Sequence, residues 1–372
     1  MSSDNNLEYK IALSLIPKIG PILAKRLIAY TGSPQAVFKE SKKNLLKIPN
    51  VGEQLAKNIT SKDYLEKAET ELKFIDKYNI HTYFFTEKSY PERLKNCEDS
   101  PVIFYSKGKV DFSHVKTLSI VGTRKPSEHG IDLCKKLIKD LAQTNDQLII
   151  VSGLAYGVDI CAHTTALEAG MKTIAVLGHG LNMVYPAMHR NVAEKIVSQG
   201  ALVTEFKSNT KAIAGNFISR NRIIAGMADA TVIVESGEKG GALITADIAN
   251  SYNRDVFAFP GRVSDKYSKG CNQLIKSNKA SLIESASDLE YLMGWEVQKQ
   301  KQRTIQRKLF QELTTKEKEI LEILKAYETI TIDHICNQLQ KSTSQISPLL
   351  LDLEFKGLVK SLPGKQYKII KI

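Results

Sequence analysis

Signals for export or membrane insertion are missing from this 372-residue sequence. No apolar run approaches the roughly 20 residues that a membrane-spanning helix needs. Residues 1–6 contain neither the basic region nor the apolar core of a signal peptide. We therefore expect a cytoplasmic protein with no membrane partner.

Cysteine is scarce: the sequence has five. They are odd in number, lie far apart and never form a C-x-x-C pair. This pattern argues against a disulfide framework and against a thiolate zinc site. Cys134 and Cys161 fall among apolar residues with helical spacing and are predicted to fill the core. We expect no metal site.

Glycine-rich nucleotide-binding signatures are also missing. A dinucleotide site would need G-x-G-x-x-G after the first strand, and an ATP site would need G-x-x-x-x-G-K-[ST]. Here the first turn reads Gly122-Thr123-Arg124, and the second predicted strand ends in Ser152-Gly153. We expect no cofactor.

Positive charge, by contrast, is abundant. Lys and Arg number 52 against 40 Asp and Glu, which gives a net charge of +12 and a pI near 9.2. This balance fits an acidic partner, either nucleic acid or an anionic membrane surface, although solvated lysines alone can produce it. The length exceeds one ordinary core, so two or three domains are expected.

The central region, residues 113–290, alternates short apolar runs with segments long enough for crossover helices. Continuous apolar character predicts strands that are covered on both faces, in a doubly wound, mostly parallel Rossmann-like sheet of the α/β class. The runs lie at 117–121, 148–151, 173–177, 201–204, 231–234, 256–259 and 282–283.

Glycines fall at the ends of these predicted strands, at Gly122, Gly153, Gly178 and Gly180. Ligands of such sheets bind outside the carboxyl ends of the strands. Glycine there lets the backbone approach a ligand, and the next helix offers free N–H groups to an anion. The pattern predicts a phosphate-reading surface, and the nearby arginines suggest nucleic acid.

Arg124 directly follows the first of these turns. Its guanidinium is predicted to project toward the crevice and to form a forked contact with a phosphate. The alternative is a salt bridge to a neighbouring loop.

Residues 216–222 predict a second group of contacts. On a helix, Phe217, Arg220 and Asn221 share one face, whereas Arg222 points elsewhere and can buttress the site. Phe217 near Arg220 suggests base stacking beside a phosphate contact, as in single-strand binders; a core aromatic is the alternative. The preceding loop can add backbone contacts through Lys207 and Lys211.

Asp159 and His163 are spaced i,i+4 and could suggest acid–base or metal chemistry. Neither a third ligand nor an activated nucleophile is evident. We therefore expect Asp159 to be a cap or an orienting group and His163 to be a structural hydrogen-bonding residue.

Residues 1–70 contain two similar segments, Ile16–Leu27 and Ile48–Ile59. Each predicts a helix end, a tight turn with glycine and a new amphipathic helix. The pair resembles a tandem helix-hairpin-helix (SAM-like) module, which offers N–H groups to DNA phosphates or serves as a protein-interaction module. Residues 71–112 are predicted to be a connector packed on the central domain.

The C-terminal part begins with a predicted basic linker, residues 291–312. Residues 313–372 predict three helices and a hairpin, which resemble a winged helix. The third helix, near 344–356, would be the recognition helix. It is poor in basic residues, so a role in protein contact or in stabilising a dimer fits this helix at least as well as a major-groove role.

Several motifs, in order and spacing, resemble the DNA-processing protein A (DprA, or Smf) family. They are Val121–Arg124, Ser152–His163, Val176–Leu181 with Tyr185-Pro186, Asn216–Gly226, Gly240–Ala246 and Val256–Gly261. The resemblance covers essentially the whole chain.

This resemblance implies a homodimer that binds single-stranded DNA, protects incoming DNA and helps to load the RecA recombinase during natural transformation, without catalytic activity. It also implies that residues 270–275 serve dimerisation and recombinase contact. The residues expected to bind DNA are Gly122, Thr123, Arg124, Ser152, Gly153, Lys211, Asn216, Phe217, Arg220, Asn221, Arg222, Gly240 and Gly241.

Two other functions compete with this expectation. The sheet also resembles lysine-decarboxylase-like phosphoribohydrolases, which cleave the base from nucleoside monophosphates by means of a P-G-G-x-G-T-x-x-E motif. Residues 235–247 occupy that position but lack the proline and the motif's glutamate. The other competing function is a duplex-DNA regulator that acts through the winged helix.

Overall fold

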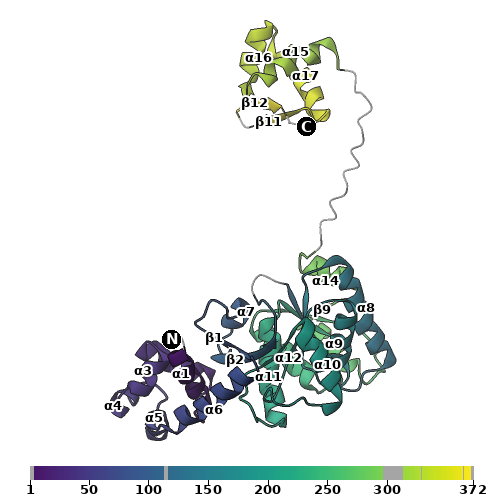
Figure 1. The fold of residues 1–372 in the computed structure, drawn as a ribbon. Helices are drawn as coiled ribbons and strands as arrows, with labels where there is room; N and C mark the ends of the chain where they lie inside the picture. Colours follow the sequence, from purple (N-terminus) through teal and green to yellow (C-terminus); the bar gives the residue numbers. More distant parts are fainter. Residues whose placement is uncertain (1–3, 113–115, 296–312, 328, 363, 370–372) are drawn as a thin grey trace. The chain divides into compact units, whose positions relative to one another are not determined.

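The computed structural model describes residues 4–112, 116–295, 313–327, 329–362 and 364–369. The chain forms two compact units, Met1–Val297 and Gln298–Ile372 (Figure 1). The first unit holds the N-terminal helices and a large sheet, and the second holds a small helical domain. Within the described residues, no helix is long and apolar enough to cross a membrane.

A nine-stranded sheet organises the first unit. Its strands are β1 (His81–Phe84), β2 (Ile103–Gly108), β3 (Thr117–Val121), β4 (Ile149–Ser152), β5 (Thr173–Val176), β6 (Ala201–Thr204), β7 (Ala230–Ile233), β8 (Asp255–Ala258) and β9 (Ser281–Leu282). They lie in the order β1-β2-β6-β5-β4-β3-β7-β8-β9. All pairs from β6 to β9 are parallel, whereas β1 and β2 are antiparallel additions. This confirms the predicted doubly wound sheet, whose direction of growth reverses between β3 and β7.

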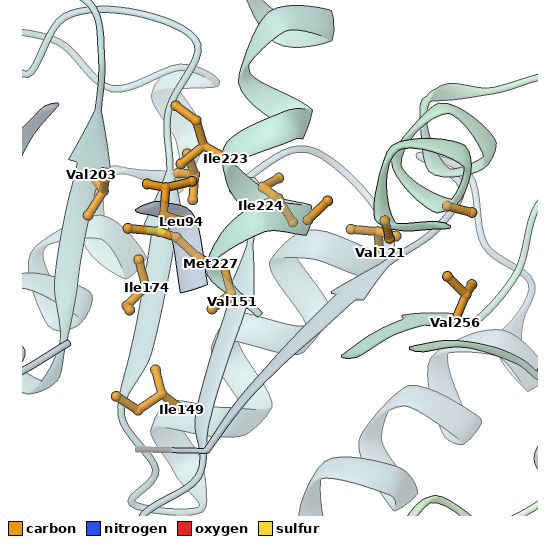
Figure 2. Packing of buried hydrophobic residues seen from close by; sticks show 14 of the residues in the cluster. Leu94, Val121, Ile149, Val151, Ile174, Val203, Ile223, Ile224, Met227 and Val256 are labelled. Carbon is orange, nitrogen blue, oxygen red and sulfur yellow. The ribbon is translucent and has the colours of Figure 1, made fainter. Parts of the chain in front are cut away.

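Helices cover both faces of this sheet. One face carries α7 (Glu92–Lys95), α11 (Ala214–Met227), α12 (Gly241–Ser251) and α13 (Lys269–Lys276). The other carries α8 (Glu128–Thr144), α9 (Val158–Glu168), α10 (Arg190–Gln199) and α14 (Ala286–Leu292). Figure 2 shows Ile223, Ile224 and Met227 of α11 in the core beside Val151 of β4. Because both faces are covered, the strands read as continuous apolar runs.

The N-terminal helices form two hairpins of the predicted helix-hairpin-helix kind. The helices are α1 (Asp4–Leu15), α2 (Pro21–Thr31), α3 (Pro34–Lys39), α4 (Lys42–Leu45), α5 (Glu53–Thr60) and α6 (Asp63–Lys77). In both turns the left-handed residue is not the glycine, because Lys18 and Asn50 have φ of 67° and 69°. Gly20 and Gly52 are instead extended and stand at the N-caps of α2 and α5, without a side-chain cap.

The segment predicted as a connector, residues 71–112, contributes two strands to the sheet. β1 pairs with β2, and β2 pairs with β6. Strand alternation sends Ile103 and Tyr105 into the core of the N-terminal helices, whereas Phe104 faces the central core. A single strand therefore belongs to two hydrophobic cores.

A buried carboxylate joins the N-terminal helices to the loop that precedes α11. Glu71 of α6 is 5% exposed and accepts hydrogen bonds from the Ser208 amide at 2.7 Å and the Ser208 hydroxyl at 2.6 Å. Gly180 donates its amide to Thr210 of the same loop at 3.1 Å. The loop is thus held from two sides before it enters α11.

The second unit is a winged helix, as predicted. It contains α15 (Thr315–Lys325), β10 (Ile330–Thr331), α16 (Ile332–Leu339), α17 (Thr343–Phe355), β11 (Val359–Leu362) and β12 (Gln366–Ile369). The three strands lie in the order β10-β12-β11; the short β10 has no signal in the sequence. Of the predicted linker 291–312, residues 296–312 lie outside the described residues.

Candidate nucleic-acid interface

A cavity of about 710 Å³ opens where the sheet reverses its direction of growth, between the ends of β3 and β7. Such switch points are where doubly wound sheets bind ligands. The turn after β3, the start of α11 and the start of α12 form most of its wall. Eight of the residues predicted to bind DNA line it: Gly122, Thr123, Arg124, Phe217, Arg220, Asn221, Gly240 and Gly241.

Phe217 is the centre of this lining. The guanidinium carbon of Arg124 lies 6.0 Å from its ring centroid, and that of Arg220 lies 5.9 Å away. Tyr185, which also lines the cavity, places its ring 5.7 Å from that of Phe217 at an angle of 40°. The site thus combines aromatic rings with cations, as single-strand binding sites do.

Two of the strand-end glycines, Gly153 and Gly178, have a different role from the predicted one. The site's own side chains occupy the space above them. A β-carbon on Gly153 would overlap the Arg220 guanidinium, and one on Gly178 would come within 2.8 Å of the Phe217 ring. These glycines are therefore needed for α11 to pack closely on the sheet. Arg124 and the start of α12 line the side of the cavity that faces a ligand.

Arg220 is buried at the cavity floor beside Asp159. It is 3% exposed, and its Nε and Nη1 atoms have no hydrogen-bond partner in the described structure. Burial lowers the pKa of Arg220 to about 10, although nearby Asp159 opposes the shift. Burial likewise raises the pKa of Asp159, and Arg220 opposes that shift. Because Arg220 presents almost no surface, its geometry suits support of Phe217 better than direct contact with a phosphate.

His163 has the structural role that was expected. Thr173 donates its hydroxyl to the Ile150 carbonyl at 2.8 Å, so it must accept from His163 Nδ1 at 2.7 Å. The proton is therefore on Nδ1, and Nε2 is buried without a partner. Burial is the main reason that the pKa of His163 falls to about 3, with a smaller effect from Arg220. Across the described part of the chain, no group of three His, Cys, Asp or Glu residues could hold a metal ion.

Acid should therefore destabilise the protein through His163. The folded state keeps this imidazole neutral, whereas the unfolded chain protonates it below its ordinary pKa near 6.5. Stability is thus unaffected above pH 6.5 and falls as the pH drops toward 3. Between pH 7 and pH 5 we expect His163 to lower the free energy of unfolding by about 2 kcal/mol. Urea unfolding at the two pH values measures this loss as the difference between wild type and His163→Gln. Parallel pH profiles for the two proteins would contradict this assignment.

The remaining predicted residues lie outside the cavity lining. Ser152 is buried and donates its hydroxyl to the Ile120 carbonyl at 2.7 Å. Arg222 forms an ion pair with Glu205, in keeping with the expected buttressing position. Lys211 is exposed, and its carbonyl accepts a hydrogen bond from the side chain of Asn216 at 3.2 Å.

Sequence reasoning missed Tyr185 and Lys239 as lining residues. Both lie in loops, where no periodicity marks the orientation of a side chain. Tyr185 stood within the Tyr185-Pro186 motif, and Lys239 directly precedes Gly240-Gly241. A lysine before a glycine pair at a helix start was the available signal.

The cavity offers little to the chemistry of a phosphoribohydrolase. Among its lining residues in the described structure, Asp159 is the sole carboxylate, and it is buried beside Arg220. Glu235, at the end of β7, is occupied elsewhere: it accepts the Ser127 amide at 2.8 Å and the Ser127 hydroxyl at 2.5 Å. Glu235 therefore fixes the start of α8.

Three family models match the chain. The model for DNA recombination-mediator protein A covers residues 81–293. The DprA winged helix domain covers residues 309–365, and a SAM-like helix-hairpin-helix tandem covers residues 11–62.

Curated relatives carry the same family names. Protein Smf of Synechocystis sp. is 30% identical over 395 residues, which cover 97% of this chain and 98% of the relative. DNA processing protein DprA of Streptococcus pneumoniae is 36% identical over 208 residues, which cover 56% and 72%.

Solved structures agree with this assignment. The X-ray structure of DprA from Streptococcus pneumoniae matches with a TM-score of 0.62 and 28% identity, over 78% of this chain and 98% of the other. DNA processing protein A from Helicobacter pylori, described with its single-stranded DNA binding mode, matches with a TM-score of 0.53 and 27% identity, over 59% and 98%.

Proposed function

Since the chain belongs to the DNA recombination-mediator protein A family, we propose that it binds single-stranded DNA in the cavity between β3 and β7. The observation that carries the proposal is the placement of Phe217 within about 6 Å of Arg124 on one wall of that cavity. An aromatic ring can stack on any unpaired base, while a guanidinium binds the phosphate.

The charges of the cavity support this reading. Arg124 and Lys239 are exposed on its wall, and the start of α12 adds N–H groups at Gly240 and Gly241. The carboxylate of Asp159 lies beside the opposite charge of Arg220, which reduces its repulsion of a phosphate. A Helicobacter pylori relative described with a single-stranded DNA binding mode shares the fold at 27% identity.

The wider role follows from the family. We propose that the protein is a homodimer that protects incoming single-stranded DNA, helps to load RecA and so serves recombination during natural transformation. In this proposal the protein is not an enzyme and needs no cofactor.

The proposal is tested with labelled oligonucleotides. Fluorescence anisotropy should show tighter binding of a single-stranded oligonucleotide than of the matching duplex, and the affinity should fall with salt because phosphate contacts release counterions. A RecA filament assay on the bound strand then tests loading. Equal or stronger duplex binding, or release of free base from a nucleoside monophosphate at an enzyme-like rate, would overturn the proposal.

A further inference from the structure

Tyr185 is an exposed aromatic residue in the cavity lining. It lies between β5 and η1 (Ala187–His189), lines the cavity, and is 46% exposed. Aromatic rings that are exposed in a groove beside a cation are typical stacking surfaces of single-strand binding proteins. Its position beside Phe217 points to a partner inside the cavity.

The backbone of Tyr185 is fixed in place by His179. The Tyr185 amide donates to Nε2 of His179 at 3.3 Å, so Nε2 must carry a lone pair. His179 Nδ1 then donates to the Gly180 carbonyl at 3.0 Å, and the Thr204 hydroxyl donates to the His179 carbonyl at 2.9 Å. His179 is fully buried, and burial lowers its pKa, which favours the neutral acceptor form. The loop is therefore preorganised, and it presents the tyrosine without further ordering cost.

The two rings form a tilted pair. Their centroids are 5.7 Å apart and their planes meet at 40°, so they are not stacked on each other. Phe217 cannot sink away from this position, because it lies against Gly178. The exposed part of Tyr185 thus remains available beside the half-buried ring of Phe217 and the guanidinium of Arg124.

We propose that Tyr185 stacks on the nucleobase adjacent to the one held by Phe217, so that the cavity takes two successive bases of a single strand. The inference rests on the proposed function and deepens it. Two stacked bases must both be unpaired, and a duplex cannot present them. Tyr185 is therefore a residue that determines the preference for single strands, whereas Arg124 holds the phosphate.

The test compares four variants with wild type, using a fluorescein-labelled oligothymidine and an abasic oligonucleotide of equal length. Tyr185→Leu should weaken oligothymidine binding about tenfold and leave the salt dependence unchanged, because it removes stacking and no charge. Tyr185→Phe should stay within about twofold of wild type, because it keeps the ring. On the abasic strand the loss caused by Tyr185→Leu should disappear.

Tyr156→Leu is the matched control. Tyr156 is 43% exposed, lies outside the cavity lining and packs its ring against His189 at 5.2 Å. Equal affinities of Tyr185→Leu and Tyr156→Leu for oligothymidine would overturn the inference, while a loss in Arg124→Ala would still support the proposed function. Absence of single-strand binding by wild type would instead remove both.

A second readout does not depend on how the variants fold. Two short oligothymidines, each with a single 2-aminopurine at one of two neighbouring positions, are titrated separately with wild-type protein. Stacking on both rings should quench the probe in both strands, and quenching in only one strand would contradict a second stacking surface.

Discussion

Arg124→Ala is expected to weaken single-stranded DNA binding by about tenfold to a hundredfold, because a hydrogen bond to a charged group contributes roughly 1.5–3 kcal/mol. Arg124 is the exposed arginine of the cavity wall and lies over Phe217. The variant should also reduce the slope of log Kd against log salt concentration by about 0.7, the value for one phosphate on a single strand. Fluorescence anisotropy across a salt series measures both quantities.

Arg220→Gln gives the contrasting case. Arg220 is buried against Gly153 and Asp159, so we expect its loss to weaken binding through the displacement of Phe217 and to leave the salt slope unchanged. Lys139→Ala removes one charge from the exposed surface of α8 and should change neither quantity. If Arg124→Ala binds as wild type does, the DNA does not lie in this cavity.

Gly157→Ala is expected to disrupt the site by displacing the backbone of Thr123 and Arg124. Gly157 has φ of +77° and is the N-cap residue of α9; a β-carbon there would overlap the Thr123 carbonyl oxygen and lie 2.8 Å from the Arg124 α-carbon. These are backbone atoms that no rotamer change can move. Left-handed strain and overpacking together predict a loss of about 2–5 kcal/mol in the free energy of unfolding. The displaced Arg124 should also weaken DNA binding.

Gly170→Ala separates backbone strain from overpacking. Gly170 has a similar φ of +76°, but no atom lies within 4 Å of the position its β-carbon would take. It should therefore show only the backbone cost, about 1–2 kcal/mol, and bind DNA normally. Urea unfolding and anisotropy on both variants make the comparison. Equal losses of stability and of DNA affinity at the two glycines would show that the contact between the α9 start and Arg124 is unimportant.

The sheet could be predicted because the apolar character of each strand is visible in a short stretch of sequence. Each strand is covered on both faces and therefore appears as an apolar run. Helical spacing put Phe217, Arg220 and Asn221 on one helix face, and all three line the cavity. The same spacing placed Arg222 elsewhere, where it pairs with Glu205.

Other features depend on contacts that sequence spacing does not encode. The sequence shows Gly153 and Gly178 at strand ends, but only the docking of α11 reveals that Arg220 and Phe217 fill the space above them. The burial of Arg220 has the same origin. Tyr185 was not predicted to line the cavity, because its backbone is held by a hydrogen bond from its amide to His179 within an aperiodic loop.

The side chains of β2 belong to two hydrophobic cores, and this limits which segments of the protein can be gained or lost in evolution. Ile103 and Tyr105 belong to the core of the N-terminal helices, Phe104 belongs to the central core, and β2 covers the edge of β6. A lineage that discarded everything before residue 113 would bare that edge, and an unpaired strand invites self-association. Loss or replacement of the helix-hairpin-helix module leaves the edges of both β6 and β2 covered only if the chain is cut before His81, where β1 begins. The match to the family model begins at the same residue.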